Sequence, residues 1–75
     1  MVEIHIGKLV KDELRRQGRT ARWLAAQVPT NRTNIYDIMR RKNIDPAMLM
    51  RLSEILEYNF FAVLADEAQR RIDAR

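Results

Sequence analysis

Residues 20–41 read TARWLAAQVPTNRTNIYDIMRR and contain two short helical patterns separated by a helix breaker. Thr20 can cap the first helix by accepting an amide hydrogen bond, and Pro29 ends it because proline cannot donate the helical hydrogen bond. The second helix should begin after Asn31, another good cap, and run to about Arg41. The apolar residues expected to face inward from this pair are Trp23, Leu24, Ala25, Val28, Ile35, Ile38 and Met39. The stretch therefore predicts two short helices joined by a tight turn.

A helix pair of this kind can present its second helix to double-stranded DNA. The major groove admits an α-helix, and each base pair shows there a distinct pattern of hydrogen-bond donors and acceptors. The first helix then rests across the phosphates. Such a module needs a small residue on the first helix for close approach, and Ala25 is the candidate. It also needs polar side chains at the start of the second helix, which residues 31–34 supply. The pattern therefore predicts a helix-turn-helix that binds DNA.

Helical spacing continues on both sides of this pair. A helix over about residues 6–17 is followed by Gly18, where a left-handed cap costs least. Asp45 and Pro46 open a fourth helix, and Asn59 can cap a fifth. The apolar residues of the first and fourth helices that should line the core are Ile6, Leu9, Val10, Leu14, Met48, Leu49, Met50, Leu52, Ile55 and Leu56. On the fifth helix, Phe61, Leu64, Ala65, Ala68 and Ile72 fall on one side. We therefore expect the whole chain to form one all-α domain, a compact bundle of four to five helices.

The two ends of the chain offer two routes to a homodimer. Residues 1–5 alternate between apolar and polar side chains, so they form either an extended arm or an edge strand that pairs across a dimer. The apolar stripe over residues 61–72 of the C-terminal helix (60–75) runs almost to the end of the chain. Either part of this stripe packs on a second copy, or Phe60, Phe61 and Leu64 close the core and residues 70–75 fray.

Residues 20–36 resemble the helix-turn-helix of the lambda-repressor-like (Cro/XRE) family. The resemblance is carried by the register of Leu24, Ala25, Val28, Ile35 and Ile38. The segment Ile6-Gly7-Lys8 resembles the family's first helix, and the later helices extend the likeness to about residue 61. The resemblance implies a lambda-repressor-like fold. It also implies a bacterial-type transcriptional regulator that binds DNA sequence-specifically as a repressor-like dimer.

The chain departs from the family pattern at three positions. Pro29 stands where relatives usually carry glycine, and proline forbids a positive φ, so the turn must take another shape. Thr30 occupies a position that is usually apolar, and Ala21 replaces an opening glutamine that often touches phosphate in relatives. Anchoring to the DNA backbone must therefore come from Arg19, Thr20 or Arg22.

The resemblance places four side chains where they would contact bases: Arg32, Thr33, Tyr36 and Asp37. Arg32 either forks onto guanine, a pairing worth about 1–3 kcal/mol of discrimination, or contacts a phosphate. Tyr36 either reaches the sugar-phosphate backbone or is half-buried in support of the helix. Asp37 either accepts a hydrogen bond from cytosine or holds Arg40 or Arg41 through a local ion pair.

Basic and polar side chains at both ends of the reading helix are expected to contact phosphates. They are Arg19, Thr20, Arg22, Asn31, Asn34, Arg40, Arg41 and Lys42. Phosphate contacts position such a protein and supply much of its affinity. Residues 1–44 hold ten Lys and Arg against four Asp and Glu, whereas residues 45–75 hold four against six. A basic half of this kind suits a polyanion on one face, although basic residues can also serve only to keep a chain soluble.

The composition argues against several other classes of protein. The chain has no cysteine, and its single histidine, His5, cannot build a metal site alone and is expected at the surface or at a helix cap. It has no paired carboxylates, no catalytic Ser/His/Asp set and no glycine-rich phosphate loop, so neither enzymatic activity nor a cofactor is expected. Binding to single-stranded RNA would require an array of exposed aromatic side chains, which the sequence lacks.

The expected setting is the cytoplasm, without contact to a membrane. The sequence shows neither a signal peptide nor a stretch of roughly 18 apolar residues. No domain for a small-molecule effector is evident. The alternative function is that of a protein-interaction module, such as an antitoxin or a partner in a phage-type switch, built on the same fold.

Overall fold

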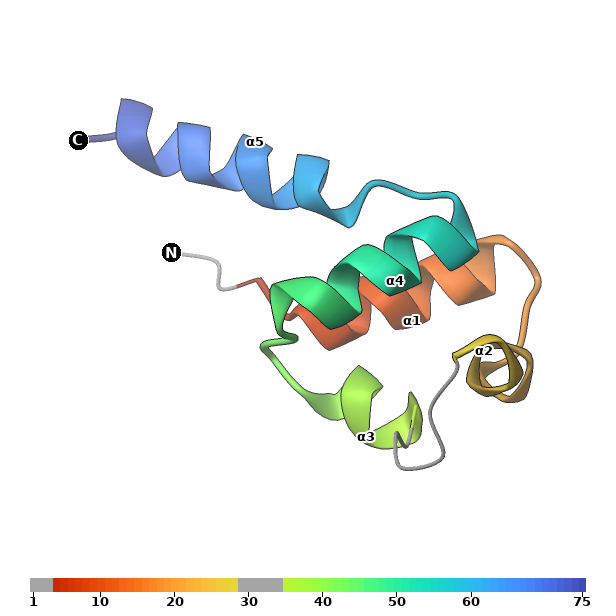
Figure 1. Cartoon of the computed structure of the whole chain (residues 1–75). Helices are drawn as coiled ribbons and strands as arrows, with labels where there is room; N and C mark the ends of the chain where they lie inside the picture. Colours follow the sequence, from red (N-terminus) through yellow and green to blue (C-terminus); the bar gives the residue numbers. More distant parts are fainter. Residues whose placement is uncertain (1–3, 29–34) are drawn as a thin grey trace.

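The computed structural model describes residues 4–28 and 35–75, which form five α-helices and no strand (Figure 1). The helices are α1 (Ile6–Arg16), α2 (Ala21–Gln27), α3 (Ile35–Arg40), α4 (Pro46–Leu56) and α5 (Phe60–Asp73). The predicted all-α fold of four to five helices is confirmed. The expected start of the third helix after Asn31 lies outside the described residues. None of the described helices is both long and apolar enough to span a bilayer.

Side chains cap the start of four helices, because the first amides of a helix have no partner within it. Thr20 Oγ1 accepts from the Trp23 amide at 3.0 Å, Asp45 Oδ2 from Met48 at 3.1 Å, and Asn59 Oδ1 from Ala62 at 3.2 Å. These three caps are as predicted. His5 Nδ1 accepts from the Lys8 amide at 3.0 Å, so His5 is a helix cap rather than part of a strand.

The end of α1 is fixed by Gly18, which has φ +70° as predicted. The Arg19 amide donates to the Leu14 carbonyl at 2.9 Å, and the Gly18 amide donates to Arg15 at 3.1 Å. This pair of bonds is the pattern that ends a helix at a left-handed residue, where glycine carries no Cβ penalty. The chain can therefore pass from α1 to α2 within four residues, and α2 crosses the direction of α1 (Figure 1).

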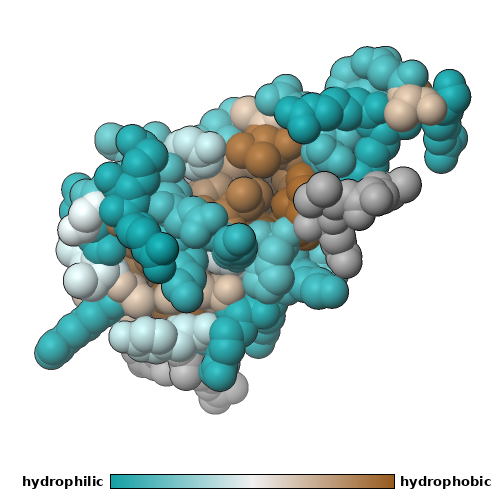
Figure 2. Space-filling view, turned by 180° about the vertical axis from the view of Figure 1, so that it is seen from behind, coloured by the Kyte–Doolittle hydropathy of each residue, from teal (hydrophilic) through white to brown (hydrophobic). Residues whose placement is uncertain are grey.

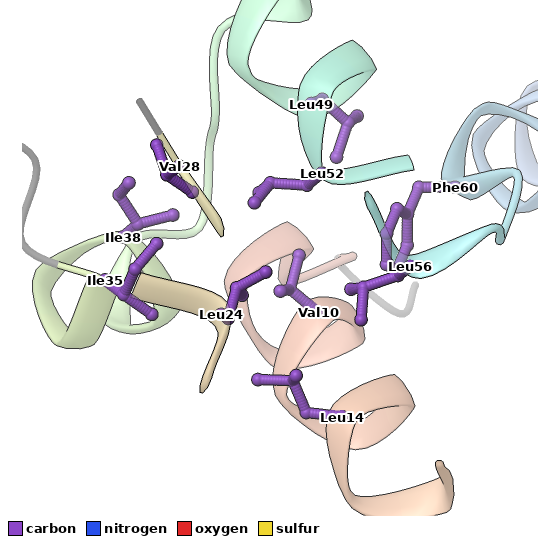
Figure 3. Close-up of a cluster of buried hydrophobic side chains, with 10 residues drawn as sticks. All are labelled: Val10, Leu14, Leu24, Val28, Ile35, Ile38, Leu49, Leu52, Leu56 and Phe60. Atoms are coloured by element: carbon purple, nitrogen blue, oxygen red, sulfur yellow. The ribbon is translucent and has the colours of Figure 1, made fainter. Parts of the chain in front are cut away.

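The hydrophobic core gathers side chains from all five helices, as Figure 3 shows. The buried apolar residues are Val10, Leu14, Leu24, Val28, Ile35, Ile38, Leu49, Leu52, Leu56 and Phe60. The apolar stripes predicted nine of these residues, and the tenth, Phe60, was expected in the core in one of the two alternatives for the C-terminal helix. Two core predictions are wrong: Met50 is 52% exposed because it lies one residue round the helix from Leu49, and Ala25 is exposed.

A close approach of α1 to the end of α3 involves Gly7, whereas Ala25, the residue expected to allow close approach, is exposed. A Cβ added at Gly7 would lie 2.5 Å from the Met39 and Arg41 carbonyl oxygens and 2.7 Å from that of Ile38. The Ile6 amide donates to the Lys42 carbonyl at 2.9 Å, and the Gly7 amide donates to Arg41 at 3.0 Å. Free amides at the start of α1 thus meet free carbonyls at the end of α3, which favours the contact electrostatically. Only glycine leaves room for this junction.

Glu13 is the one buried charged residue among those described. Its carboxylate accepts from Arg16 Nε at 2.9 Å and from Gln17 Nε2 at 2.6 Å, and the same Gln17 amide donates to the Leu56 carbonyl at 2.8 Å. The hydrogen bond from Arg16, together with that from Gln17, outweighs burial and lowers the pKa of Glu13 from its ordinary value of 4.5. The network ties α1 to the end of α4.

We expect Glu13→Gln to remove an acid-sensitive part of the stability. A carboxylate with a lowered folded-state pKa stabilises the fold above its ordinary value of 4.5 and loses this effect as the pH falls through the lowered value. The variant should therefore unfold at lower urea concentration than the wild type at pH 7, and the two midpoints should converge as the pH falls through the lowered pKa of Glu13. Asp12→Asn, at an exposed carboxylate of the same helix, is the control. A constant gap across this pH range would contradict the assignment.

Helix α5 extends away from the body of the molecule towards the C-terminus, and Phe60 in its first turn is its one buried residue (Figure 1). Phe61 and Leu64 pack partly on the core. Seen from behind, apolar surface lies where α5 departs from the body (Figure 2). The expectation that residues 70–75 fray is wrong as far as Asp73, where the helix ends. Glu67 forms salt bridges with Arg70 and Arg71, about one turn further along the helix. These contacts support the last turns of α5, where positive charge also suits the helix C-terminus.

Candidate nucleic-acid interface

A groove runs between α1 and α3, with a volume of about 590 Å³. Its lining residues are Lys11, Leu14, Arg15, Arg19, Ala21, Tyr36, Met39 and Arg40. A second hollow of about 380 Å³ adjoins it, shares Lys11, Arg15, Met39 and Arg40, and adds His5, Lys8 and Asp12. We call the two hollows together the basic groove. Five exposed cations from α1, the turn after it and α3 line this groove.

Helix α3 and the two residues after it carry five of the predicted contact residues: Tyr36, Asp37, Arg40, Arg41 and Lys42. Tyr36 is 58% exposed, so it does not support the helix from a half-buried position. Asp37 forms an ion pair with Arg40, which is the second of the two roles considered for this carboxylate. The side chains of Arg41 and Lys42 are exposed, and their backbone carbonyls accept hydrogen bonds from the first amides of α1. These side chains are therefore accessible to a ligand without disturbing the junction.

The start of α2 brings the second group of predicted phosphate contacts to the same region. The Arg19 guanidinium lies 4.0 Å from the centre of the Trp23 ring, a cation–π contact that holds this arginine beside the groove. Trp23 is half-buried against the core, as expected. Thr20 is engaged as the cap of α2, and Arg22 is exposed.

Four predicted site residues lie outside the described part of the chain. They are Asn31, Arg32, Thr33 and Asn34. The first two predicted base contacts therefore stay predictions, and the described part of the interface consists mainly of groups suited to phosphates.

The sequence analysis missed three exposed cations of the basic groove: Lys8, Lys11 and Arg15. Their spacing of three and four residues places them on one face of α1, beside the apolar stripe of that helix. This spacing is a readable signal, but it looks like any solvated helix face until α3 is placed next to it. The structure joins them to Arg19 and Arg40, which the sequence did predict as contacts.

Comparison with protein-family models, with curated proteins and with solved structures finds no match to this chain. Within residues 4–28 and 35–75, no group of three or more acidic or histidine side chains is arranged to hold a metal ion. What the basic groove binds must therefore be inferred from its own side chains.

Proposed function

We propose that this protein is a sequence-specific double-stranded DNA-binding regulator of the lambda-repressor-like kind. In this proposal α3 and the residues before it enter the major groove, and the cations around it contact phosphates. The observation that carries the proposal is that five exposed cations surround one groove. They come from α1, from the turn between α1 and α2, and from the end of α3. The other half of the chain, residues 45–75, is mildly acidic. This separation of charge suits a polyanion approached from one side.

Duplex DNA suits this groove better than a single strand or a small anion. Single-stranded nucleic acids are usually bound on platforms of several aromatic side chains. Among the described residues that line this groove, Tyr36 is the one phenylalanine, tyrosine or tryptophan. The cations come from three separate segments, which matches the extended array of phosphates along a duplex.

We expect Arg41→Gln combined with Lys42→Gln to weaken duplex binding by roughly tenfold or more at moderate salt. Two lost phosphate contacts should also reduce the slope of log affinity against log salt by about 2. Fluorescence anisotropy with a labelled duplex at several salt concentrations measures both. Arg70→Gln with Arg71→Gln removes the same charge from α5 and should leave the slope unchanged. Equal losses in the two variants would indicate a nonspecific effect of net charge and contradict the proposal.

The same fold used as a protein-interaction module is the second candidate function, and α5 favours it. The apolar stripe of this helix continues past its contacts with the core to Ile72, which is 62% exposed. A second copy of the chain is the partner that the repressor-like proposal requires.

We expect the wild type to sediment as a dimer at micromolar concentration and Ile72→Asp to shift it to a monomer. Ile72 is exposed, so this change should not alter the thermal unfolding of the monomer. A wild type that sediments as a monomer, with residues 60–75 mobile in NMR relaxation, would remove α5 as a partner surface.

A further inference from the structure

Three cations form a continuous strip along α1, which we call the α1 strip: Lys8, Lys11 and Arg15. All three are exposed and line the basic groove. They span seven residues of helix, which corresponds to about 10 Å. Phosphates of one DNA strand follow one another at 3.4 Å along the helix axis. The strip is longer than the axial rise between neighbouring phosphates, so its three cations can contact two or three phosphates of one strand.

The three cations of the α1 strip form no ion pair within the described part of the protein. Neighbouring arginines behave differently, since Arg16 of the same helix binds the buried Glu13. The positive charges of the strip are therefore available to an anionic ligand.

One acidic residue, Asp12, also lines this part of the basic groove. It reduces the local charge of the strip from +3 to +2 but leaves a clear positive excess. Asp37 lies on α3 and already pairs with Arg40. The groove thus keeps its positive character when its acidic neighbours are counted.

The floor of the basic groove is apolar where its rim is charged. Leu14 is buried beneath it, and Met39 and Ala21 are half-buried. Tyr36 stands exposed at its edge. A sugar-phosphate strand has matching chemistry, because its deoxyriboses can lie on apolar surface while its phosphates meet cations at the rim.

We propose that the basic groove seats one sugar-phosphate strand of the bound duplex, with the α1 strip contacting its phosphates. The inference rests on the proposed function and extends it, because it makes α1 a part of the DNA interface in addition to the helix pair α2 and α3. The α1 strip should contribute to the affinity for DNA and to the position of the protein along it, while the contacts to bases are made by the helix pair α2 and α3.

The composition of the chain allows a direct test, because its only lysines are Lys8, Lys11 and Lys42. Wild-type protein is treated with an amine-acylating reagent, alone and with a mixed-sequence duplex at low salt, and modification is read at each lysine by mass spectrometry. Lys42 reports the proposed function, and the other two lysines report the α1 strip. We expect the duplex to protect all three by several-fold.

The outcomes separate the two proposals. Protection of Lys42 with unchanged modification of Lys8 and Lys11 would overturn the inference and leave the proposed function standing. No protection at any lysine, together with no binding by anisotropy, would overturn both.

A charge variant provides an independent measurement of the same contacts. Lys8→Gln with Lys11→Gln should reduce the slope of log affinity against log salt by about 2 without changing the preferred DNA sequence. Arg70→Gln with Arg71→Gln is again the control of equal charge. An unchanged slope would contradict the inference.

Discussion

Gly7→Ala is expected to leave much of the protein unfolded at 25 °C. The added methyl group would lie 2.5 Å from two backbone carbonyl oxygens at the end of α3, which cannot move aside as a flexible side chain could. Overpacking costs about 1–3 kcal/mol, and each of the two amide–carbonyl bonds at the junction contributes about 1 kcal/mol. A domain of this size is stable by only about 5 kcal/mol. Circular dichroism and urea unfolding measure the loss.

The direction of this effect is itself informative. Within a helix, alanine is normally favoured over glycine by about 1 kcal/mol, so without the junction Gly7→Ala would stabilise the protein. Gly18→Ala is the control, because a Cβ there meets nothing within 4 Å and pays only for the positive φ. This control should cost about 1 kcal/mol. A Gly7→Ala variant as stable as the wild type would show that α1 and α3 do not meet as described.

Phe60→Ala is expected to destabilise the protein by about 3–5 kcal/mol, the usual cost of removing a fully buried aromatic ring. Phe60 is 0% exposed and is the one buried residue of α5. Its ring also meets that of Tyr58 edge to face, with centroids 4.9 Å apart. Its loss would open a cavity beside Leu56 and release the helix from the core. Urea unfolding followed by fluorescence of Trp23 measures the change.

The neighbouring phenylalanine supplies the matched control. Phe61 is only half-buried, so Phe61→Ala removes the same side chain at a smaller cost. We expect its midpoint to lie between those of the wild type and Phe60→Ala. The reverse order would mean that α5 is attached through the other face.

Features of the fold that depend on nearby residues could be predicted from the sequence. The caps at Thr20, Asp45 and Asn59 and the left-handed turn at Gly18 each involve residues within one or two turns of one another. The helical stripes likewise reveal a buried face through their period alone. The positions of the helices and most of the core residues could therefore be predicted from local sequence patterns.

Contacts between distant segments could not be predicted in this way. The Gly7 junction joins residues more than thirty positions apart, and the Glu13 network reaches Leu56 through Gln17. The helical period places Glu13 on the apolar stripe of α1 and Asp12 outside it, but it does not show that Gln17 joins Glu13 to Leu56. Both features depend on how the helices cross, which periodicity does not specify.

The candidate site was predictable only in part for the same reason. Arg19 and Arg40 flank the helix pair in sequence, so they could be assigned from it, and the structure brings both to the basic groove. Lys11 and Arg15 join them only because α1 packs beside α3.

Selection from a randomised duplex library, sequenced after binding at two salt concentrations, tests the central proposal most directly. The proposal predicts enrichment of a defined motif at both concentrations, with lower recovery at the higher one because phosphate contacts weaken in salt. For a dimer, the motif should be an inverted repeat with half-sites about 34 Å apart or a multiple of that distance. Recovery without any enriched motif, or no binding at low salt, would contradict a sequence-reading regulator.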